Sequence, residues 1–261
     1  MDRVRHEGRT TAYEVYDRGG DGTPILFVHG SGGSRAVWSG QSRLATERPV
    51  VAMDLAGHGE SDDIDADPGY EALSAYVDDV VAVGEATGAG VVAGSSLGGA
   101  VALTLALERE YPLDGLVLAG TGAKLAVLQD LLDWLDDDFD RAVDWLHDDE
   151  RLFYSEDEAY LTASREAMRE AGRAVTRRDF LTSHAFDVRD RLEEVDVPAL
   201  AVVGEHDRLT PRWYHEFLAD ELPTCELAVI EDAAHLAMLE QPAAFNAAIE
   251  EFCERFVDEE S

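Results

Sequence analysis

Lysine is nearly absent from the sequence: of 21 basic residues only Lys124 is a lysine, and the others are arginines. The 261-residue chain has 55 aspartates and glutamates, so its formal net charge is −34. So acidic a chain repels nucleic-acid phosphates and anionic membrane surfaces, and we expect neither as a partner. The acidic excess runs along the whole chain, which is typical of a well-solvated acidic cytosolic protein or of a protein in a salt-accumulating cytoplasm. We favour the second interpretation, because the excess is not confined to a tail; molar salt screens such repulsion to within about 3 Å.

Cysteines and long apolar runs are scarce as well. Cys225 and Cys253 are too few for a disulfide framework and lack the CxxC spacing of a metal or redox site, so we interpret them as small apolar side chains. No stretch approaches the roughly 18 consecutive apolar residues of a membrane-spanning helix. Residues 1–7 lack the apolar run of a secretory signal, and we expect a soluble, cytoplasmic protein. No cluster of metal ligands is visible in the sequence, and no feature of it indicates an oligomeric state.

The apolar residues, 46% of the chain with the aromatic ones included, are enough for a large core and fall into short continuous runs. Runs of this length are typical of strands that are buried on both faces of a parallel sheet. Helical patterns at 70–86 and 97–108 alternate with them, which predicts a doubly wound α/β sheet. A strand-turn-strand segment over 3–17 opens the chain. The further strands are expected at 24–28, 50–53, 90–93, 115–119, 198–203 and 226–230, and a last helix at about 242–257.

The stretch from about Lys124 to Arg191 interrupts this alternation. It has no strand-like run, it is dense in charged residues, and its apolar residues recur at helical spacing. A structureless connection of that length is improbable inside a compact domain, so we predict three or four inserted helices. The predicted division is a core domain, 1–123 and 191–261, and a helical insertion, 124–190.

A serine between two glycines is the candidate nucleophile. The segment Gly94–Gly98 (GSSLG) follows an apolar run and precedes an alanine-rich helical pattern. A tight strand-to-helix turn needs glycine two residues before and two residues after the serine, since a Cβ there would clash. Ser96 then lies at a helix N-terminus, where backbone N–H groups favour developing negative charge. A phosphate-binding turn or a plain helix start is the alternative interpretation, and Ser95, which lacks the flanking glycines, is only a neighbour.

A serine hydroxyl needs a base, and eight histidines compete for that role. The chain order in such a site is serine, then aspartate or glutamate, then histidine. His235 follows the last apolar run and so lies on a loop after a strand, where catalytic side chains usually occur. Asp207 directly follows another strand and is the candidate orienting carboxylate, with Glu205 as the alternative. We interpret the other histidines as structural (His29), exposed (His6, His147 and His215), solvent-facing beside the acid (His206), and surface or packing (His184).

Acyl transfer also needs hydrogen-bond donors for the oxyanion. One candidate is the backbone N–H of Leu97, directly after the nucleophile, and the second should come from an early loop. The glycine-rich segment 29–33 follows a predicted strand and can fold toward Ser96. Its Ser31 N–H is the better candidate, and that of Gly32 is next.

Candidate substrate contacts are Gly32, Trp38 and Met238, which lie near these motifs in the sequence. Aromatic residues of the insertion could also line an apolar pocket, although at helical spacing such side chains more often form a core between helices. They are Trp134, Trp145, Phe153, Phe180 and Phe186. The segment 54–61 follows a further strand, and we interpret it as a structured turn without chemistry.

These motifs, taken in order, resemble those of the α/β-hydrolase superfamily. The resemblance covers the chain outside the insertion: His29-Gly30, the turn at 54–61, the segment 94–99, Asp207 and His235. It implies a mainly parallel eight-stranded sheet flanked by helices, with the insertion as a helical lid. It is closest to lidded esterases, enol-lactone hydrolases and carbon–carbon-bond hydrolases of meta-cleavage pathways. Haloalkane dehalogenases and epoxide hydrolases look similar but use an aspartate nucleophile.

The resemblance implies two-step acyl transfer without a metal or cofactor. Ser96 attacks a carbonyl, His235 takes its proton, and Asp207 holds the imidazole in the required tautomer. A hydrolase of carboxylic esters or lactones, with a small and largely apolar substrate, is the favoured function. A carbon–carbon-bond hydrolase or a cofactor-free perhydrolase would use the same residues. A slow ligand-binding signalling member of the fold is the third alternative.

Overall fold

The computed structural model describes residues 1–148, 150–155 and 157–258 of the chain. Its centre is an eight-stranded sheet with the order β1-β2-β4-β3-β5-β6-β7-β8. The pairs β1–β2 and β2–β4 are antiparallel, and all other neighbours are parallel. The strands are β1 (Asp2–His6), β2 (Arg9–Tyr16), β3 (Ile25–Val28), β4 (Val50–Met53), β5 (Val91–Ser95), β6 (Gly115–Ala119), β7 (Ala199–Gly204) and β8 (Cys225–Ile230).

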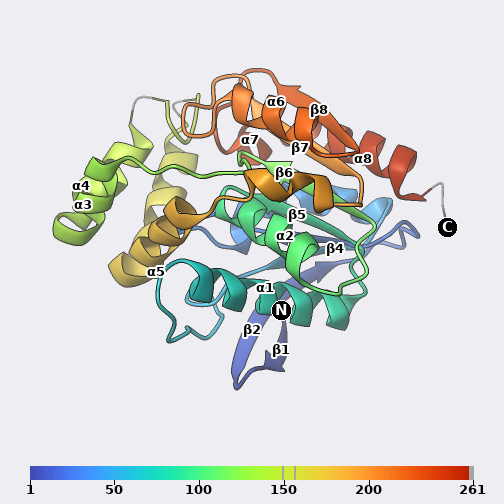
Figure 1. The fold of residues 1–261 in the computed structure, drawn as a ribbon, viewed down its shortest axis with the longest axis horizontal. Helices are drawn as coiled ribbons and strands as arrows, with labels where there is room; N and C mark the ends of the chain where they lie inside the picture. Colours follow the sequence, from blue (N-terminus) through green and yellow to red (C-terminus); the bar gives the residue numbers. More distant parts are fainter. Residues whose placement is uncertain (149, 156, 259–261) are drawn as a thin grey trace.

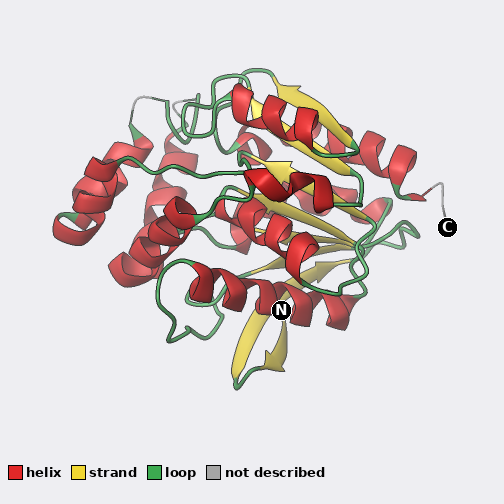
Figure 2. Ribbon diagram, viewed as in Figure 1, coloured by secondary structure: helices red, strands yellow, loops and turns green. Residues whose placement is uncertain are grey.

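Helices cover both faces of this sheet, as Figure 2 shows. The side chains of β3 illustrate why, since all four are buried and alternate between the faces. Leu26 and Val28 belong to the core on the face covered by α1 and α2, whereas Ile25 and Phe27 belong to the core on the face covered by η1 and α8. The helices are η1 (Arg35–Thr46), α1 (Tyr70–Thr87), α2 (Leu97–Glu108), α3 (Gln129–Asp137), α4 (Phe139–His147), α5 (Glu158–Ala185), η2 (Arg189–Glu194), α6 (Arg212–Glu221), α7 (Ala237–Glu240) and α8 (Pro242–Phe256).

The predicted α/β sheet is confirmed, with every expected strand present. The helix expected at 97–108 is α2, and those expected at 70–86 and about 242–257 are α1 and α8. The helices η1, η2, α6 and α7 are not predicted from the sequence; the first three lie in connections between strands, and α7 is a short helix between β8 and α8. Among the described residues, no helix is both long enough and apolar enough to cross a membrane.

Three helices, α3, α4 and α5, interrupt the chain between β6 and β7 and lie together at one end of the sheet (Figure 1). They have a small core of their own, to which α3 contributes Leu131 and Leu135 and α4 contributes Val143 and Leu146. Helix α5 is kinked at Gly172, whose φ of 80° lies in the left-handed region that glycine tolerates. The kink gives α5 two segments of different direction, and both approach the carboxyl ends of the strands.

Both cysteines are free, and Cys253 is buried while Cys225 is half-buried. Burial raises the pKa of each thiol to about 12. Neither is therefore a thiolate at neutral pH, which agrees with their interpretation as small apolar side chains.

Candidate active site

The turn between β5 and α2 holds Ser96 in a strained backbone conformation, with φ 54° and ψ −115°. Both neighbouring glycines are required, since a Cβ on Gly94 would lie 2.1 Å from Gly98 O and a Cβ on Gly98 would lie 2.3 Å from Val28 O. Hydrogen bonds fix the turn: Ser96 N–H donates to the carbonyl of Ala119 (2.9 Å). A positive φ at a non-glycine residue persists only where the surroundings enforce it, and it is characteristic of functional sites.

Asp207 follows β7, His235 follows β8, and the two side chains meet. His235 Nδ1 lies 2.9 Å from Asp207 Oδ2. The same carboxylate accepts hydrogen bonds from the N–H groups of Leu209 (2.8 Å) and Thr210 (2.9 Å) and from the Thr210 hydroxyl (2.8 Å). Burial opposes ionisation of Asp207, but the facing His235 and these donors outweigh it and hold the pKa of this carboxyl below its ordinary value. A charged Asp207 fixes the Nδ1–H tautomer of His235.

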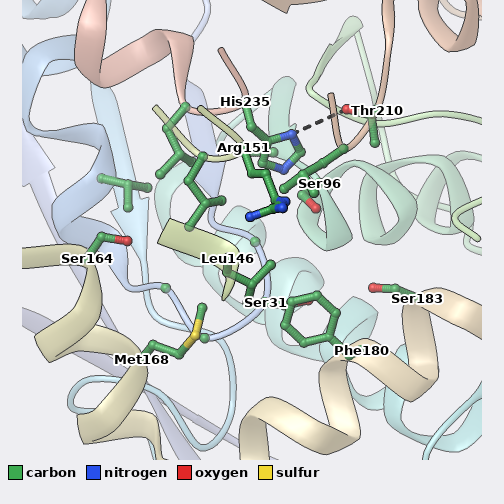
Figure 3. Close-up of a pocket in the computed structure, with 18 of the residues that line it drawn as sticks. Ser31, Ser96, Leu146, Arg151, Ser164, Met168, Phe180, Ser183, Thr210 and His235 are labelled. Carbon is green, nitrogen blue, oxygen red and sulfur yellow. Dashed lines mark hydrogen bonds between the residues drawn. The ribbon is translucent and has the colours of Figure 1, made fainter. Parts of the chain in front are cut away.

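Ser96 and His235 line one cavity of ≈ 860 Å³ (Figure 3). The Nε2 atom of His235 forms no hydrogen bond to the described part of the chain, because only Nδ1 is engaged. Gly30, in the loop after β3, lies directly against the serine: a Cβ there would be 3.0 Å from Ser96 Cβ. The cavity therefore brings together a strained serine, an imidazole with one open nitrogen, and the glycine-rich loop.

Both candidate oxyanion donors are backbone N–H groups that are free to bind a ligand. Within the described chain, the N–H groups of Ser31 and Leu97 have no hydrogen-bond acceptor, and Ser31 lines the cavity. Leu97 is the first residue of α2, so its N–H has no partner within the helix. Gly32 also lines the cavity, but its N–H donates to Asp179 Oδ2 at 3.1 Å. Gly32 is therefore not the alternative donor that the sequence suggested.

Two of the predicted substrate contacts are wrong. Trp38 is fully buried on the opposite side of η1, where its ring lies 4.8 Å from that of Phe27 and 6.1 Å from that of Phe245. Met238 belongs to the same core. Their neighbours Val37 and Leu239 line the cavity instead. The sequence places these residues near the site but does not tell which side of a short helix faces it.

The cavity lining is largely apolar, and the described residues that form it include no aspartate or glutamate. Of the aromatic residues of the insertion, Trp145, Tyr160 and Phe180 line the cavity. Trp134 and Phe153 pack within the insertion, and Phe186 packs in the main core. Arg151 also lines the cavity and stacks on Trp145, with its guanidinium carbon 4.0 Å from the ring centre.

Two histidines predicted to be exposed are buried. His147 Nδ1 donates to Val143 O (2.7 Å), and the ring packs against α5 through Ser164. His215 is fully buried, and its Nε2 accepts the N–H of Thr121 (3.0 Å). Burial lowers the pKa of His215 to about 4. The polar sequences around both residues belong to the outer faces of their helices, and the histidines lie on the inner faces.

His215 supports the turn that holds Ser96, a role that the sequence did not indicate. The Thr121 whose N–H it accepts donates its hydroxyl to Ser96 O at 2.9 Å. Thr121 follows β6, so the carboxyl ends of two neighbouring strands are linked at this point. The proximity of neighbouring strand ends can be anticipated from a parallel sheet. His215 lies in α6, between β7 and β8, and nothing in the sequence indicates that this helix directs it at the end of β6.

The remaining candidates are as follows. His29 is a buried structural residue, whose Nδ1 donates to Gly30 O (2.8 Å) and whose Nε2 accepts Leu55 N–H (3.0 Å). Glu205 is exposed and lies 3.6 Å from His206, so it is not directed at His235. His6 is half-buried, His184 is exposed, and His206 is half-buried and stacked on Tyr154.

The turn at 54–61 is held by Asp54, which accepts the N–H groups of Arg35 (2.8 Å) and Glu60 (3.1 Å). It also contains an interaction that sequence reasoning missed. His58 is buried and its Nε2 lies 2.9 Å from Asp179, which comes from α5.

Comparison with known proteins agrees with this fold. The model of the alpha/beta hydrolase family matches residues 25–248. The chain is 28% identical over 254 residues to a pimeloyl-[acyl-carrier protein] methyl ester esterase of Neisseria meningitidis, covering 91% of this chain and 78% of that protein. It is 28% identical over 273 residues to a putative carbamate hydrolase, RutD, of Azorhizobium caulinodans, covering 95% and 97% of the two chains.

Solved structures are similar over nearly the whole chain. A thermophilic esterase superposes with a TM-score of 0.85 at 32% identity, covering 98% of this chain and 97% of that one. Est816, an N-acyl homoserine lactone degrading enzyme, superposes with a TM-score of 0.84 at 27% identity, covering 96% and 100%.

Proposed function

The chain belongs to the alpha/beta hydrolase family, and from this premise we propose that it hydrolyses a carboxylic ester or lactone through an acyl-enzyme intermediate. Ser96 is the nucleophile, His235 the base and Asp207 the orienting acid. The observation that carries the proposal is that Ser96, His235 and Ser31 line one cavity, and that the Ser31 N–H has no acceptor within the described chain. The esterases and the lactone-degrading enzyme among the similar proteins support an ester bond as the target.

The proposed reaction uses these groups in two steps. His235 Nε2 removes the proton of the Ser96 hydroxyl as its oxygen attacks the carbonyl carbon, and Asp207 stabilises the resulting imidazolium. The N–H groups of Leu97 and Ser31 bind the oxyanion of the tetrahedral intermediate. His235 then returns the proton to the leaving alcohol, which departs and leaves the acyl group on Ser96. A water molecule activated by His235 then attacks the carbonyl of the acyl group bound to Ser96. Collapse of this second tetrahedral intermediate releases the carboxylic acid and restores the Ser96 hydroxyl.

The lining of the cavity favours a small, largely apolar substrate. Apolar side chains dominate the lining, and Leu146, Met168 and Phe180 are contributed by α4 and α5. We therefore assign residues 124–190 the role of a lid over the core domain formed by 1–123 and 191–261. The described lining carries no carboxylate, so in a chain of net charge −34 the acidic product meets no like charge at the cavity wall. We further propose that the enzyme works in a salt-rich cytoplasm.

The test is hydrolysis of short-chain p-nitrophenyl esters in molar KCl by the native protein, Ser96→Ala and Ser95→Ala. High salt keeps an acidic protein folded, so that inactivity cannot be mistaken for unfolding. We expect Ser96→Ala to lower kcat by about 10³-fold or more. Ser95→Ala is the matched control, because it removes the adjacent hydroxyl, and it should retain kcat within about threefold.

Folded native protein without ester or lactone hydrolysis would contradict the proposal. Equal losses in Ser95→Ala and Ser96→Ala would contradict the assignment of the nucleophile. Trapping of the acyl group on a peptide that contains Ser96, read by mass spectrometry, would support the covalent intermediate directly.

A further inference from the structure

The loop after β3 is attached to the inserted helices by one buried carboxylate. Residues 30–33 form a tight turn that is closed by a hydrogen bond from Gly33 N–H to Gly30 O (3.1 Å). Gly32, the third residue, has a φ of 65°, as a type II turn requires. The middle peptide of the turn directs the N–H of Gly32 at Asp179 Oδ2. Because Asp179 lies in α5, a helix of the insertion holds the turn in place.

The surroundings of Asp179 keep this acceptor charged and immobile. Its carboxylate is fully buried and also accepts the Tyr76 hydroxyl (2.6 Å) and His58 Nε2 (2.9 Å). The other ring nitrogen of His58 lies 3.1 Å from the carbonyl of Ala56, so both nitrogens face acceptors and both are satisfied only in the imidazolium form. Burial opposes charge on both partners, but their attraction outweighs it, raising the pKa of His58 and lowering that of Asp179.

Helix α5 meets the turn on both sides of its kink at Gly172. Before the kink, Met168 packs against Gly32, where an added Cβ would lie 3.0 Å from Met168 Cγ. After the kink, Asp179 binds the Gly32 N–H, and its neighbour Arg178 donates to the Tyr76 hydroxyl at 3.0 Å. The turn is thus held between two segments of one inserted helix.

We propose that Asp179 is a positioning residue for the oxyanion site. Its hydrogen bond to the Gly32 N–H anchors the turn to α5 and thereby holds Ser31 in place, and Asp179 does not itself touch the substrate. The Ser31 N–H belongs to the peptide that precedes the anchored one, so a turn that shifts away from α5 carries this donor with it. The inference rests on the proposed function, since only acyl transfer gives the Ser31 N–H an oxyanion to bind. It makes the inserted helices part of the oxyanion site as well as of the cavity wall.

The first test compares Asp179→Ala with Asp79→Ala. Asp79 is a matched control: it is fully buried in α1, accepts a loop N–H, that of Ala56 (3.0 Å), and pairs with Arg9 (2.9 Å). We expect Asp179→Ala to lower kcat by about 10- to 100-fold with little change in KM, since outright removal of an oxyanion donor costs about 10²- to 10³-fold. Asp79→Ala should be destabilised to a similar extent but retain kcat within about threefold.

The second readout separates positioning from a general loss of structure. A trifluoromethyl ketone adds reversibly to the serine hydroxyl and forms a tetrahedral oxyanion, so its Ki reports the oxyanion donors. In Asp179→Ala this Ki should rise by the same factor by which kcat/KM falls. Competitive inhibition by the carboxylic acid product, which forms no such oxyanion, should be unchanged. Equal weakening of both inhibitors would overturn the positioning role.

If Asp179→Ala does not accumulate as folded protein, the double variant His58→Leu with Asp179→Leu replaces it. Removing both charges avoids the isolated buried charge that destabilises single variants most. Its kcat and its trifluoromethyl ketone affinity should show the same losses, and native values for both would overturn the inference. Absence of Ser96-dependent turnover in the native enzyme would instead overturn the proposed function, and this inference with it.

Discussion

Two buried histidine–aspartate pairs in this protein have the same contact and different surroundings. In each pair a ring nitrogen lies 2.9 Å from a carboxylate oxygen: His235 from Asp207, and His58 from Asp179. The second ring nitrogen of His58 donates to the carbonyl of Ala56. The second ring nitrogen of His235 forms no hydrogen bond to the described chain, and the residue lines the cavity.

The difference shows that a carboxylate alone does not make a histidine a base. Both carboxylates orient an imidazole, but only an open nitrogen can accept a proton from a substrate-binding cavity and return it. His58 is hydrogen-bonded at both ring nitrogens, to Ala56 and to Asp179, and has no nitrogen open to a cavity. The pair formed by Asp207 and His235 is suited to proton transfer, whereas the pair formed by Asp179 and His58 is suited to holding a loop.

The largest expected effect comes from exchanging the histidine of each pair for glutamine. His235→Gln should lower kcat by about 10³-fold or more. It should destabilise the protein less than His58→Gln does, because Asp207 keeps three other hydrogen bonds, from the N–H groups of Leu209 and Thr210 and from the Thr210 hydroxyl. His58→Gln should lower kcat by less than about 100-fold but destabilise the protein by about 3–5 kcal/mol, because Asp179 is left as an unpaired buried charge. Ester kinetics and thermal melting measure both. Equal kinetic losses in two folded variants would remove the distinction between the pairs.

A smaller effect is expected on the pH dependence of the free energy of unfolding, and it is specific to the pair formed by His58 and Asp179. The pKa of Asp179 is lowered from 3.8, so its contribution is complete above that pH and is lost as the pH falls through the folded value. The pKa of His58 is raised from 6.5, so its contribution is complete below that pH and is lost as the pH rises through the folded value.

The difference in the free energy of unfolding between the native protein and the double variant (His58→Leu with Asp179→Leu) should therefore be greatest between pH 3.8 and 6.5. Urea unfolding below, within and above this window measures it. A difference that does not vary with pH would show that the pair is not ionised in the folded protein.

The smallest effect concerns salt, which should act on the surface and not on the buried pair. With a net charge of −34, the melting temperature of the native protein should rise between dilute buffer and molar KCl. The difference in melting temperature between the native protein and Asp179→Ala should stay the same, because buried charges are screened much less than exposed ones. A melting temperature independent of KCl would argue against adaptation to a salt-rich cytoplasm.

The nucleophile turn and the positions of Asp207 and His235 could be predicted because their signals are local. The glycines at 94 and 98 are required by clashes within one turn, and this spacing is visible in the sequence. Asp207 and His235 each follow a buried strand, and the parallel sheet brings their strand ends together.

The wrong predictions concern the direction in which a side chain points. Trp38 and Met238 are close in sequence to cavity residues, yet both face the core, because one residue further along a helix turns the side chain through about 100°. His147 and His215 stand in polar segments but lie on the buried faces of their helices. The polarity of the neighbouring residues in the sequence does not tell which residue of a helix faces the core.

The fold, the family and the local form of the turn around Ser96 follow from the sequence, because apolar periodicity and close glycine contacts operate over a few residues. Only the folded chain shows which histidine nitrogen is open, which backbone N–H groups are unpaired, and which carboxylate accepts the Gly32 N–H. Gly32 and Asp179 are 147 residues apart, and nothing local marks that aspartate among 55 acidic residues. Its role arises from burial, which removes water as a competing partner and makes one carboxylate the acceptor for three donors.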